Sequence, residues 1–220
     1  MNIEVLYEDN HLIAVYKPAG VLVQKGDTEG HDDNTLYWQV KEFIKKRDQK
    51  PGNVFLGVLH RLDRPVSGIV MFAKTSKGAA RLSEQFREGT IQKIYHAVVA
   101  GRPDPARGTL RHILSKDVEI KKAQVSEEGS ESILHYETVR SGPKYSLVKI
   151  ILKTGRFHQI RAQLSAIGHP IIGDVKYGAP EPLPDGSLAL CATELTFTTA
   201  TTDEPKTISI KIPPEWTKLL

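Results

Sequence analysis

Asp63 is the residue of this chain whose setting points most directly to chemistry. It lies in a polar loop, with Arg61 and Arg64 on either side of it. Apolar, β-prone runs precede the loop (Val54 to Leu59) and follow it (Ile69 to Phe72), and both are typical of buried strands. Strands that hold a loop at both ends can place a carboxylate accurately. For an isolated Asp, an ion pair with a neighbouring arginine in a surface turn would be the simpler interpretation.

A second polar segment, Thr154 to Arg161, has the same position after a predicted strand. It reads Thr-Gly-Arg-Phe-His-Gln-Ile-Arg and follows the apolar run Leu147 to Leu152. Three shorter motifs accompany these two segments, namely Lys17-Pro18-Ala19-Gly20-Val21, Tyr95-x-Ala97 and Gly173-Asp174-x-x-Tyr177-Gly178.

These motifs resemble those of the RluA family of pseudouridine synthases. His60-Arg61-Leu62-Asp63, followed after three residues by Ser67-Gly68, is similar to the family's signature. The second segment looks like its Gly-Arg-x-His-Gln-Ile/Leu-Arg block. All five motifs occur in the family's order, and the resemblance extends from about Ile3 to the C-terminal strands. Val66, where many members carry Thr, departs from the pattern and bears on the packing of the loop.

The resemblance implies the isomerisation of uridine to pseudouridine in ribosomal or transfer RNA. The bond from C1′ to N1 is broken, the uracil turns, and C5 is joined to C1′. Because nothing is oxidised and no group is carried away, the reaction needs neither a redox cofactor nor a metal. The sequence likewise offers no Gly-rich phosphate loop, no Cys pair and no His-x-x-x-His spacing. We therefore expect no cofactor and no metal.

The resemblance also implies roles for three catalytic residues. Asp63 is the catalytic carboxylate, which either attacks covalently or abstracts a sugar proton. Arg161 is its expected ionic partner, because a lone carboxylate in a dry site is costly. Tyr95 lies over the uracil or takes part in the final deprotonation of C5. A solvent-facing arginine on a helix and an ordinary core tyrosine are the structural alternatives for Arg161 and Tyr95.

Four further residues are candidates for substrate binding. Because uridine is stacked in RNA, it must be extruded, and Arg61 is expected to fill the vacated space. Ile160 is expected to form the apolar floor of the base pocket, although a core isoleucine would look the same. Lys17 and Arg156 are candidates for phosphate contacts. Asp174, by contrast, is expected to shape its turn and not to take part in catalysis.

Composition permits an RNA partner without demanding one. The chain has 220 residues, a formal net charge of +4 and a pI of about 9.0, which is only mildly basic. The single cysteine, Cys191, lies in a strand-like run and predicts a buried thiol. There is no signal-peptide pattern, and no apolar run approaches the ~20 residues that span a bilayer. We expect a cytoplasmic monomer with no membrane association.

Hydrophobic periodicity predicts an α+β fold with a large mixed, mostly antiparallel sheet and a few packed helices. One helix is expected to follow an N-cap at Asn34 and to end by Pro51-Gly52. A second should run from Thr75 or Ser76 to Gly89, and a third from about Phe157 to Ile167.

Nothing in the composition marks a boundary, so we expect one catalytic domain over residues 1–220. The resemblance implies that it lacks the N-terminal S4 RNA-binding domain of many relatives. Ten strands are expected: Ile3 to Tyr7, Leu12 to Tyr16, Val54 to Leu59, Ile69 to Lys74, Ile91 to Ala100, Thr109 to Ser115, Ser132 to Arg140, Tyr145 to Lys153, Leu188 to Thr198 and Thr207 to Ile212.

Two other functions compete with this one. A catalytically silent RNA-binding module would keep the fold, but Asp63, Tyr95 and Arg161 are all present. A glycoside hydrolase needs a second acid near the first and aromatics for sugar stacking. Aromatic residues make up only 7% of this chain, and no second acid is linked by a motif to Asp63. An RNA pseudouridine synthase is therefore the favoured interpretation.

Overall fold

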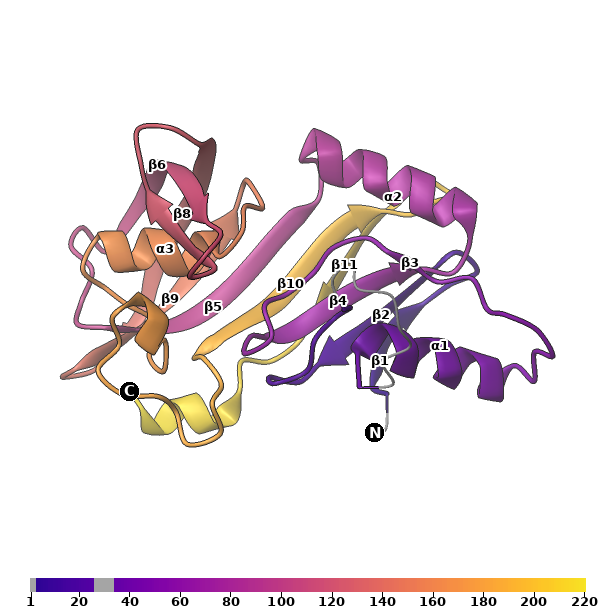
Figure 1. Cartoon of the computed structure of the whole chain (residues 1–220), viewed down its shortest axis with the longest axis horizontal. Coiled ribbons are helices and arrows are strands. Elements are labelled where there is room, and N and C mark those ends of the chain that lie inside the picture. The colour runs from indigo at the N-terminus through magenta and orange to yellow at the C-terminus, as the bar shows by residue number, and fades with distance from the viewer. Residues whose placement is uncertain (1–2, 26–33) are drawn as a thin grey trace. The chain divides into compact units, whose positions relative to one another are not determined.

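The computed structural model describes residues 3–25 and 34–220, and in them the chain has the expected α+β fold (Figure 1). Eleven strands hydrogen-bond in the order β1-β2-β4-β10-β5-β9-β8-β6-β7, with β3 also on β4 and β11 also on β10. Antiparallel pairing joins β1 to β2, β2 and β3 to β4, β5 to β9, β9 to β8, β8 to β6, and β6 to β7. The strands are β1 (Val5–Glu8), β2 (Leu12–Lys17), β3 (Gly57–Val58), β4 (Ser67–Ala73), β5 (Gln92–Ala100), β6 (Arg107–Asp117), β7 (Lys122–Val125), β8 (Ser130–Ser141), β9 (Tyr145–Leu152), β10 (Leu190–Thr198) and β11 (Pro205–Ser209).

The chain divides into two compact units, which we describe separately. Unit 1 comprises Met1–Ile91 and Leu195–Ile210, and unit 2 comprises Gln92–Glu194 and Lys211–Leu220. Strand β10 therefore contributes residues to both units. The expectation of a single catalytic domain over residues 1–220 stays a prediction.

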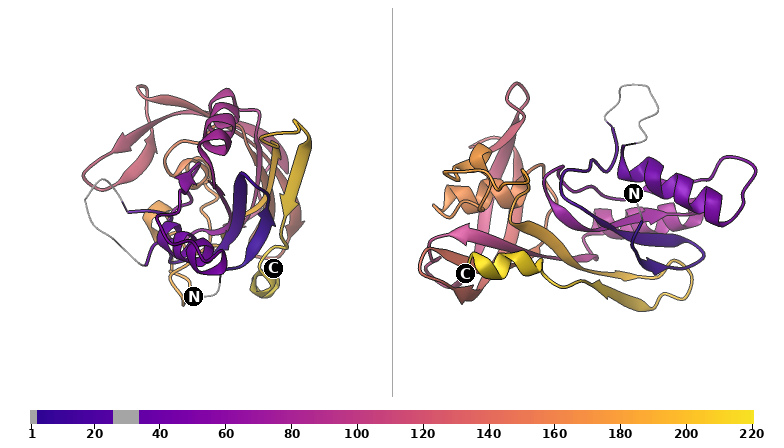
Figure 2. Two further views of the ribbon diagram at one scale, coloured as in Figure 1. Left: turned by 90° about the vertical axis from the view of Figure 1, so that its right-hand side faces the viewer. Right: turned by 90° about the horizontal axis from the view of Figure 1, so that it is seen from below.

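Unit 1 is built on β2 and β4, which are covered on both faces. Leu12 to Val15 are fully buried, and every residue of β4 is buried. One apolar cluster joins alternate residues of the two strands to Leu82 of helix α2 (Ser76–Glu88) and to residues of β10 and β11. Strand β11 turns back to pair with β10 (Figure 2). The near-continuous apolar sequences of β2 and β4 follow from this burial on both faces.

Helix α2 confirms its predicted boundaries. The side chain of Thr75 accepts a hydrogen bond from the Gly78 N–H at 3.1 Å, and Gly89 ends the helix in the left-handed region at φ 71°. Helix α1 (Leu36–Arg47) was expected to be capped by Asn34, but Thr35 holds the N-cap position. The expected cap was therefore wrong by one residue, because Thr35 and Asn34 are both residue types that cap helices.

The predicted strand Val54 to Leu59 is mostly wrong, because only Gly57 and Val58 pair with β4. Val54 and Leu56 are nevertheless buried, so the apolar run reports packing against the core without strand pairing. The sequence analysis also missed β7, a four-residue strand whose exposed end carries no clear alternation. Two short 3-10 helices were missed as well, η1 (Val175–Tyr177) and η2 (Pro214–Lys218).

Unit 2 is an antiparallel sheet on which the short α-helix α3 (Gln159–Ala166) packs. Strand β5 pairs with β9 along its length, with Tyr95 opposite Ile150. Helix α3 is shorter than predicted and contacts β6, β7 and η1 (Figure 1). It begins after His158, whose backbone is left-handed at φ 50°. A small cluster of Leu114, Ala123, Ala162 and Tyr177 fills the space between the helix and the sheet.

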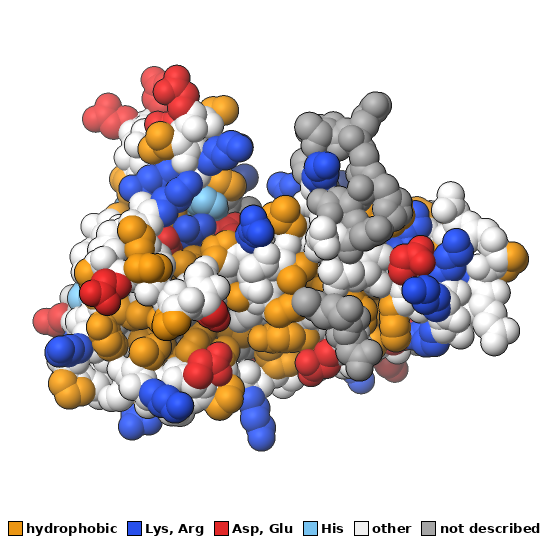
Figure 3. All heavy atoms as spheres, turned by 60° about the horizontal axis from the view of Figure 1, so that its bottom comes forward, with side chains coloured by type: hydrophobic (Ala, Val, Ile, Leu, Met, Phe, Trp, Pro, Cys, Tyr) orange, Lys and Arg blue, Asp and Glu red, His pale blue; other side chains and the backbone are white. Residues whose placement is uncertain are grey.

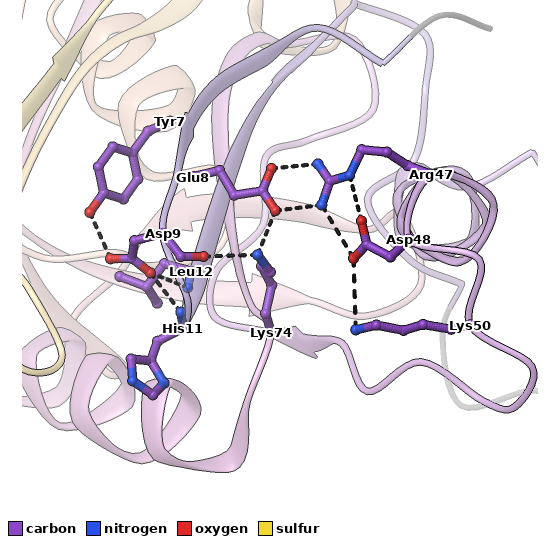
Figure 4. A network of polar contacts seen from close by, with 9 residues as sticks. All are labelled: Tyr7, Glu8, Asp9, His11, Leu12, Arg47, Asp48, Lys50 and Lys74. Atoms are coloured by element: carbon purple, nitrogen blue, oxygen red, sulfur yellow. Dashed lines mark hydrogen bonds and ion pairs between the residues drawn. The ribbon is translucent and has the colours of Figure 1, made fainter.

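A network of ion pairs links α1 to the strands of unit 1 (Figure 4). Arg47, in the last turn of α1, donates to both carboxylate oxygens of Glu8 on β1, at 2.6 and 2.8 Å. Lys74, just after β4, donates to Glu8 and to the backbone carbonyl of Asp9. The hydrogen bond from Arg47 lowers the pKa of the Glu8 carboxyl, and Lys74 adds to this effect. One carboxylate thus ties a helix end to two strand ends.

We predict that Arg47→Met lowers the free energy of unfolding at neutral pH by about 1 kcal/mol or less, because the guanidinium is 37% exposed and screened by solvent. Since the folded-state pKa of Glu8 is lowered, this contribution is present above the ordinary glutamate pKa and is lost as pH falls through the folded-state value. Chemical denaturation of both proteins between pH 3 and 7 measures it. A difference that stays constant as Glu8 becomes protonated would contradict the network.

Candidate active site

Asp63 lies in a tight turn whose flanks are anchored in the core. The Val66 N–H donates to the Asp63 carbonyl at 3.1 Å, and this closes the turn just before β4 begins. Leu62 and Val66 are buried, at 8% and 2% exposure. Asp63 itself is half-buried, and Arg61 and Arg64 are exposed. The turn therefore holds the carboxylate between two apolar anchors and leaves the flanking guanidinium groups at the surface.

The turn is fastened to the loop that follows β2, where the Lys17-to-Val21 motif lies. The Gly20 N–H donates to the Arg64 carbonyl at 2.8 Å, and the Arg64 Nε–H donates to the Gly20 carbonyl at 2.9 Å. Two of the motifs found in the sequence, 44 residues apart at this point, therefore meet in unit 1. Each restrains the backbone of the other.

Lys17 holds the two loops together from inside. Its side chain is fully buried, and its ammonium donates to the carbonyls of Pro18, Val21 and Arg64 at 3.1, 2.7 and 3.1 Å. An ammonium has three N–H donors, and these three carbonyls use all of them. This geometry contradicts the expectation that Lys17 contacts a phosphate. Lys17 is a buried cross-link of the loop that carries Asp63.

Burial of Lys17 lowers its pKa to about 8, and the negative charge of Asp63 acts in the opposite direction. The two groups therefore lie close enough to influence each other electrostatically. A buried charge is tolerated only when it is fully hydrogen-bonded, which the three carbonyls achieve here. The lowered pKa means that the folded protein loses this proton more readily than the unfolded chain.

We predict that Lys17→Met destabilises the protein by about 2 kcal/mol at pH 7, because buried carbonyls lose their donor. Between pH 8 and the ordinary lysine pKa of about 10.4, the unfolded wild type binds a proton that the folded one has lost. Wild-type stability therefore gains from this titration as pH rises, and the variant lacks the gain. Denaturant titrations should show the difference widening across this range. A difference that narrows would contradict the assignment.

In unit 2, two buried glutamines of α3 fix the second motif against the sheet. The amide oxygen of Gln159 accepts hydrogen bonds from the Thr154 hydroxyl and the Arg156 N–H, at 2.7 and 3.0 Å. Its amide nitrogen donates to the Ile133 carbonyl and to Gln163. Gln163 in turn donates to the carbonyls of two strands, β6 and β8. The sequence analysis gave neither glutamine a role, although their spacing of four residues in a helical segment was the available signal.

Arg161 is buried at 6% exposure and does not face solvent. Its Nε and Nη2 donate to the two carboxylate oxygens of Asp174 at 2.7 and 2.8 Å. The guanidinium also lies over the ring of Tyr177, with its carbon 4.8 Å from the ring centroid. The alternative of a surface arginine is therefore wrong. A bidentate pair of this kind holds the guanidinium plane in one orientation.

Asp174 has two structural roles, of which the sequence analysis predicted one. Its carbonyl accepts the N–H groups of Tyr177 and Ala179, so it does shape the turn. The preceding Gly173 has a φ of +87°, and a Cβ atom there would lie 2.7 Å from the Ser187 carbonyl oxygen. The missed role is that of the carboxylate, which is 1% exposed and pairs with Arg161.

We predict strong coupling between Arg161 and Asp174. Arg161→Met and Asp174→Asn each leave a buried group without its charged partner, and each should destabilise the protein by about 3 kcal/mol. The double variant should cost much less than the sum of the two, with an interaction energy above about 1 kcal/mol. Thermal and denaturant unfolding of the four proteins measure this cycle. Strictly additive losses would mean that the pair contributes nothing specific.

The structure places the remaining candidates as follows. Tyr95 is on β5 and Ile160 is the second residue of α3, and both are buried, at 8% and 5% exposure. Arg156 is exposed, and its Nε donates to the Glu131 carbonyl at 3.3 Å. Arg61 and Asp63 belong to unit 1, whereas Tyr95, Arg156, Ile160 and Arg161 belong to unit 2. The pairing of Asp63 with Arg161, and the roles of Tyr95, Ile160, Arg61 and Arg156, stay predictions.

The chain also matches a known protein family. The family model for RNA pseudouridylate synthase matches residues 11–166, well over half of the chain. The chain belongs to this family. The matched residues include the Asp63 turn, the Tyr95 strand and the Arg161 helix, so the match covers most of the motifs described above.

Several bacterial relatives are similar over most of this family member's length. The dual-specificity RNA pseudouridine synthase RluA of Vibrio cholerae is 35% identical, over 89% of this chain and 77% of its own. The tRNA pseudouridine synthase C of Haemophilus influenzae is 33% identical, over 99% of this chain and 96% of its own. Among solved structures, human RNA pseudouridylate synthase domain containing 4 has a TM-score of 0.77 at 23% identity, covering 97% of this chain and 90% of its own. That likeness confirms the fold.

Within residues 3–25 and 34–220, no group of three or more His, Cys, Asp and Glu side chains is arranged to hold a metal ion. None of the helices described there has both the length and the apolar character needed to cross a membrane.

Proposed function

We propose that this protein isomerises specific uridines in structured ribosomal or transfer RNA to pseudouridine, with Asp63 as the catalytic carboxylate. The observation that carries the proposal is the anchoring of the Asp63 turn. In a chain of this family, the turn that bears the signature aspartate is cross-linked by the buried Lys17 ammonium and closed on both sides by core residues. A side chain held in this way is suited to attack or deprotonate one atom of a bound nucleotide.

The reaction is an isomerisation, so the composition of the nucleotide is unchanged. The C1′–N1 bond breaks, the freed uracil turns, and a C5–C1′ bond forms. N1 ends with a proton, and the proton on C5 is released. Asp63 starts the sequence, either by attack at C1′ or by abstraction of a sugar proton. Tyr95, on its rigid strand, packs against the base and assists the loss of the C5 proton. No step requires a metal or an organic cofactor.

Arg161 is proposed to hold Asp63 ionised during this sequence. A guanidinium has five N–H donors, and the bidentate pair with Asp174 engages two of its nitrogens. That pairing is therefore compatible with a second carboxylate on the same guanidinium. Asp174 then acts as a positioning residue, because it sets the plane in which Arg161 presents its remaining donors.

RNA contacts are proposed for the exposed cationic and aromatic groups of unit 2. Phe157 is 38% exposed and stacks on the His158 ring, with centroids 3.8 Å apart. The Lys116 ammonium lies over the Phe157 ring, 4.8 Å from the ring centroid. Arg156, which precedes Phe157 in the sequence, is exposed. Aromatic rings with neighbouring cations suit bases and phosphates of unpaired RNA. Figure 3 shows Lys and Arg side chains at several places on the face that it draws.

A catalytically silent RNA-binding module is the second candidate, and Asp63→Asn separates the two. We predict that this change abolishes the release of tritium from RNA labelled at uridine C5, while RNA affinity is retained because it comes from phosphate contacts. The assay is run in excess EDTA, since the proposed reaction uses no metal. Asp203→Asn is the matched control, because Asp203 is an exposed aspartate of unit 1 in a left-handed turn at φ 52° that asparagine also adopts.

Wild-type turnover in the Asp63→Asn protein would refute the catalytic assignment. A wild type that binds RNA but releases no tritium from any cellular RNA would favour the silent module. The individual RNA and uridine are to be identified by mapping pseudouridines in total RNA with and without the gene. The cytoplasmic location and the monomeric state stay predictions.

A further inference from the structure

The pairing of β3 with β4 stops after two residues, and it stops at the point where the chain turns towards Asp63. Gly57 is opposite Ala73, and Val58 is opposite Phe72. Continuing this register would place Leu59 opposite Met71. In an antiparallel ladder, hydrogen-bonded pairs recur at every second residue. If the ladder continued, the Leu59 carbonyl would therefore compete for the N–H of Met71.

His60 takes that N–H instead. The Met71 N–H donates to Nε2 of the His60 imidazole at 3.0 Å. The side chain thus replaces a backbone carbonyl of the ladder. Because the N–H is satisfied by a side chain, the backbone of residues 59 and 60 is not required to follow β4. The chain leaves the sheet here, which accounts for the end of the pairing after Val58.

The imidazole is held in place from its other side by α2. The rings of His60 and Phe86 have centroids 5.1 Å apart and are inclined by 31°. Leu59 and Phe86 both pack against the apolar cluster of unit 1. Nε2 accepts a hydrogen bond, so it carries no proton, and the neutral ring must carry its proton on Nδ1. The His60 side chain is thus restrained by a hydrogen bond from β4 and a ring contact with α2, and the hydrogen bond defines its tautomer.

We propose that His60 is a positioning residue that sets where the chain leaves β4 and thereby where Asp63 stands. Only two residues separate the two side chains, so a change at His60 is passed to Asp63 with little slack. Without the imidazole acceptor, the ladder can extend by the Leu59–Met71 pair. Extending a ladder draws following residues towards the strand and re-aims their side chains. This proposal rests on the catalytic role proposed for Asp63.

The test compares replacements that keep or remove the acceptor. In His60→Gln, the amide oxygen lies as many bonds from Cβ as Nε2 does, so it can accept the Met71 N–H. His60→Leu has similar bulk and no acceptor. We expect His60→Leu to lower kcat by roughly 100-fold, as misplacement by about 1 Å does, with RNA affinity unchanged. His60→Gln should recover most of that loss. The same two changes at His135 of β8, whose ring bonds Thr109, should leave kcat unchanged.

A second measurement reads the hydrogen bond without any activity. Long-range nitrogen–proton NMR spectra of the wild type at neutral pH should show Nε2 of His60 unprotonated, and a proton on Nε2 would overturn the proposal. If His60→Leu does not fold, His60→Asn replaces it, because its acceptor is one bond too short. If the wild type is active and His60→Gln lowers kcat as much as His60→Leu or His60→Asn does, the proposal is also overturned. A wild type with no turnover would instead refute the proposed function and this proposal with it.

Discussion

The buried ammonium of Lys17 is the interaction on which the Asp63 site depends. A charge in the interior must be fully hydrogen-bonded, and three backbone carbonyls from two loops supply the bonds here. Neither loop can move without breaking at least one of them. The hydrogen bonds of this one ammonium therefore fix the position of the loop after β2 relative to the turn that bears Asp63. The lysine contributes to the site through geometry, because its three N–H donors bond backbone carbonyls of the two loops.

The same principle recurs in unit 2 with different groups. Arg161 and Asp174 are both buried, and their paired geometry satisfies charges that would otherwise be costly. Gln159 and Gln163 are likewise buried polar residues with hydrogen-bond partners, on a helix, α3, in which most residues are buried. A helix with polar groups on a buried face is stable only when each group has a partner. The glutamine amide nitrogens donate to carbonyls of neighbouring strands, and the Gln159 amide oxygen accepts from the Thr154 hydroxyl and the Arg156 N–H. The motif around Arg161 is thus held from the helix and from the sheet.

Much of the fold could be predicted because it follows from local physics. Helix α2 was placed from a threonine cap and a glycine end, which act within a few residues of the chain. Strands β5 and β9 were placed to within a residue or two, because long apolar runs report burial directly. The strand before Asp63 was mispredicted, since its apolar residues pack without pairing and a histidine side chain takes the place of the ladder. No periodicity in the sequence reports that substitution.

The sequence by itself determined the family, the order of the motifs and the identity of the candidate carboxylate, because these depend only on which residues occur and in what order. The tertiary structure decided which side chains are partners. It moved Lys17 from a surface role to a buried cross-link and gave Arg161 a carboxylate partner 13 residues away. It also showed His60 bonded to a strand backbone 11 residues away. Pairing of polar groups depends on burial, and burial arises only when distant segments exclude water from the same place.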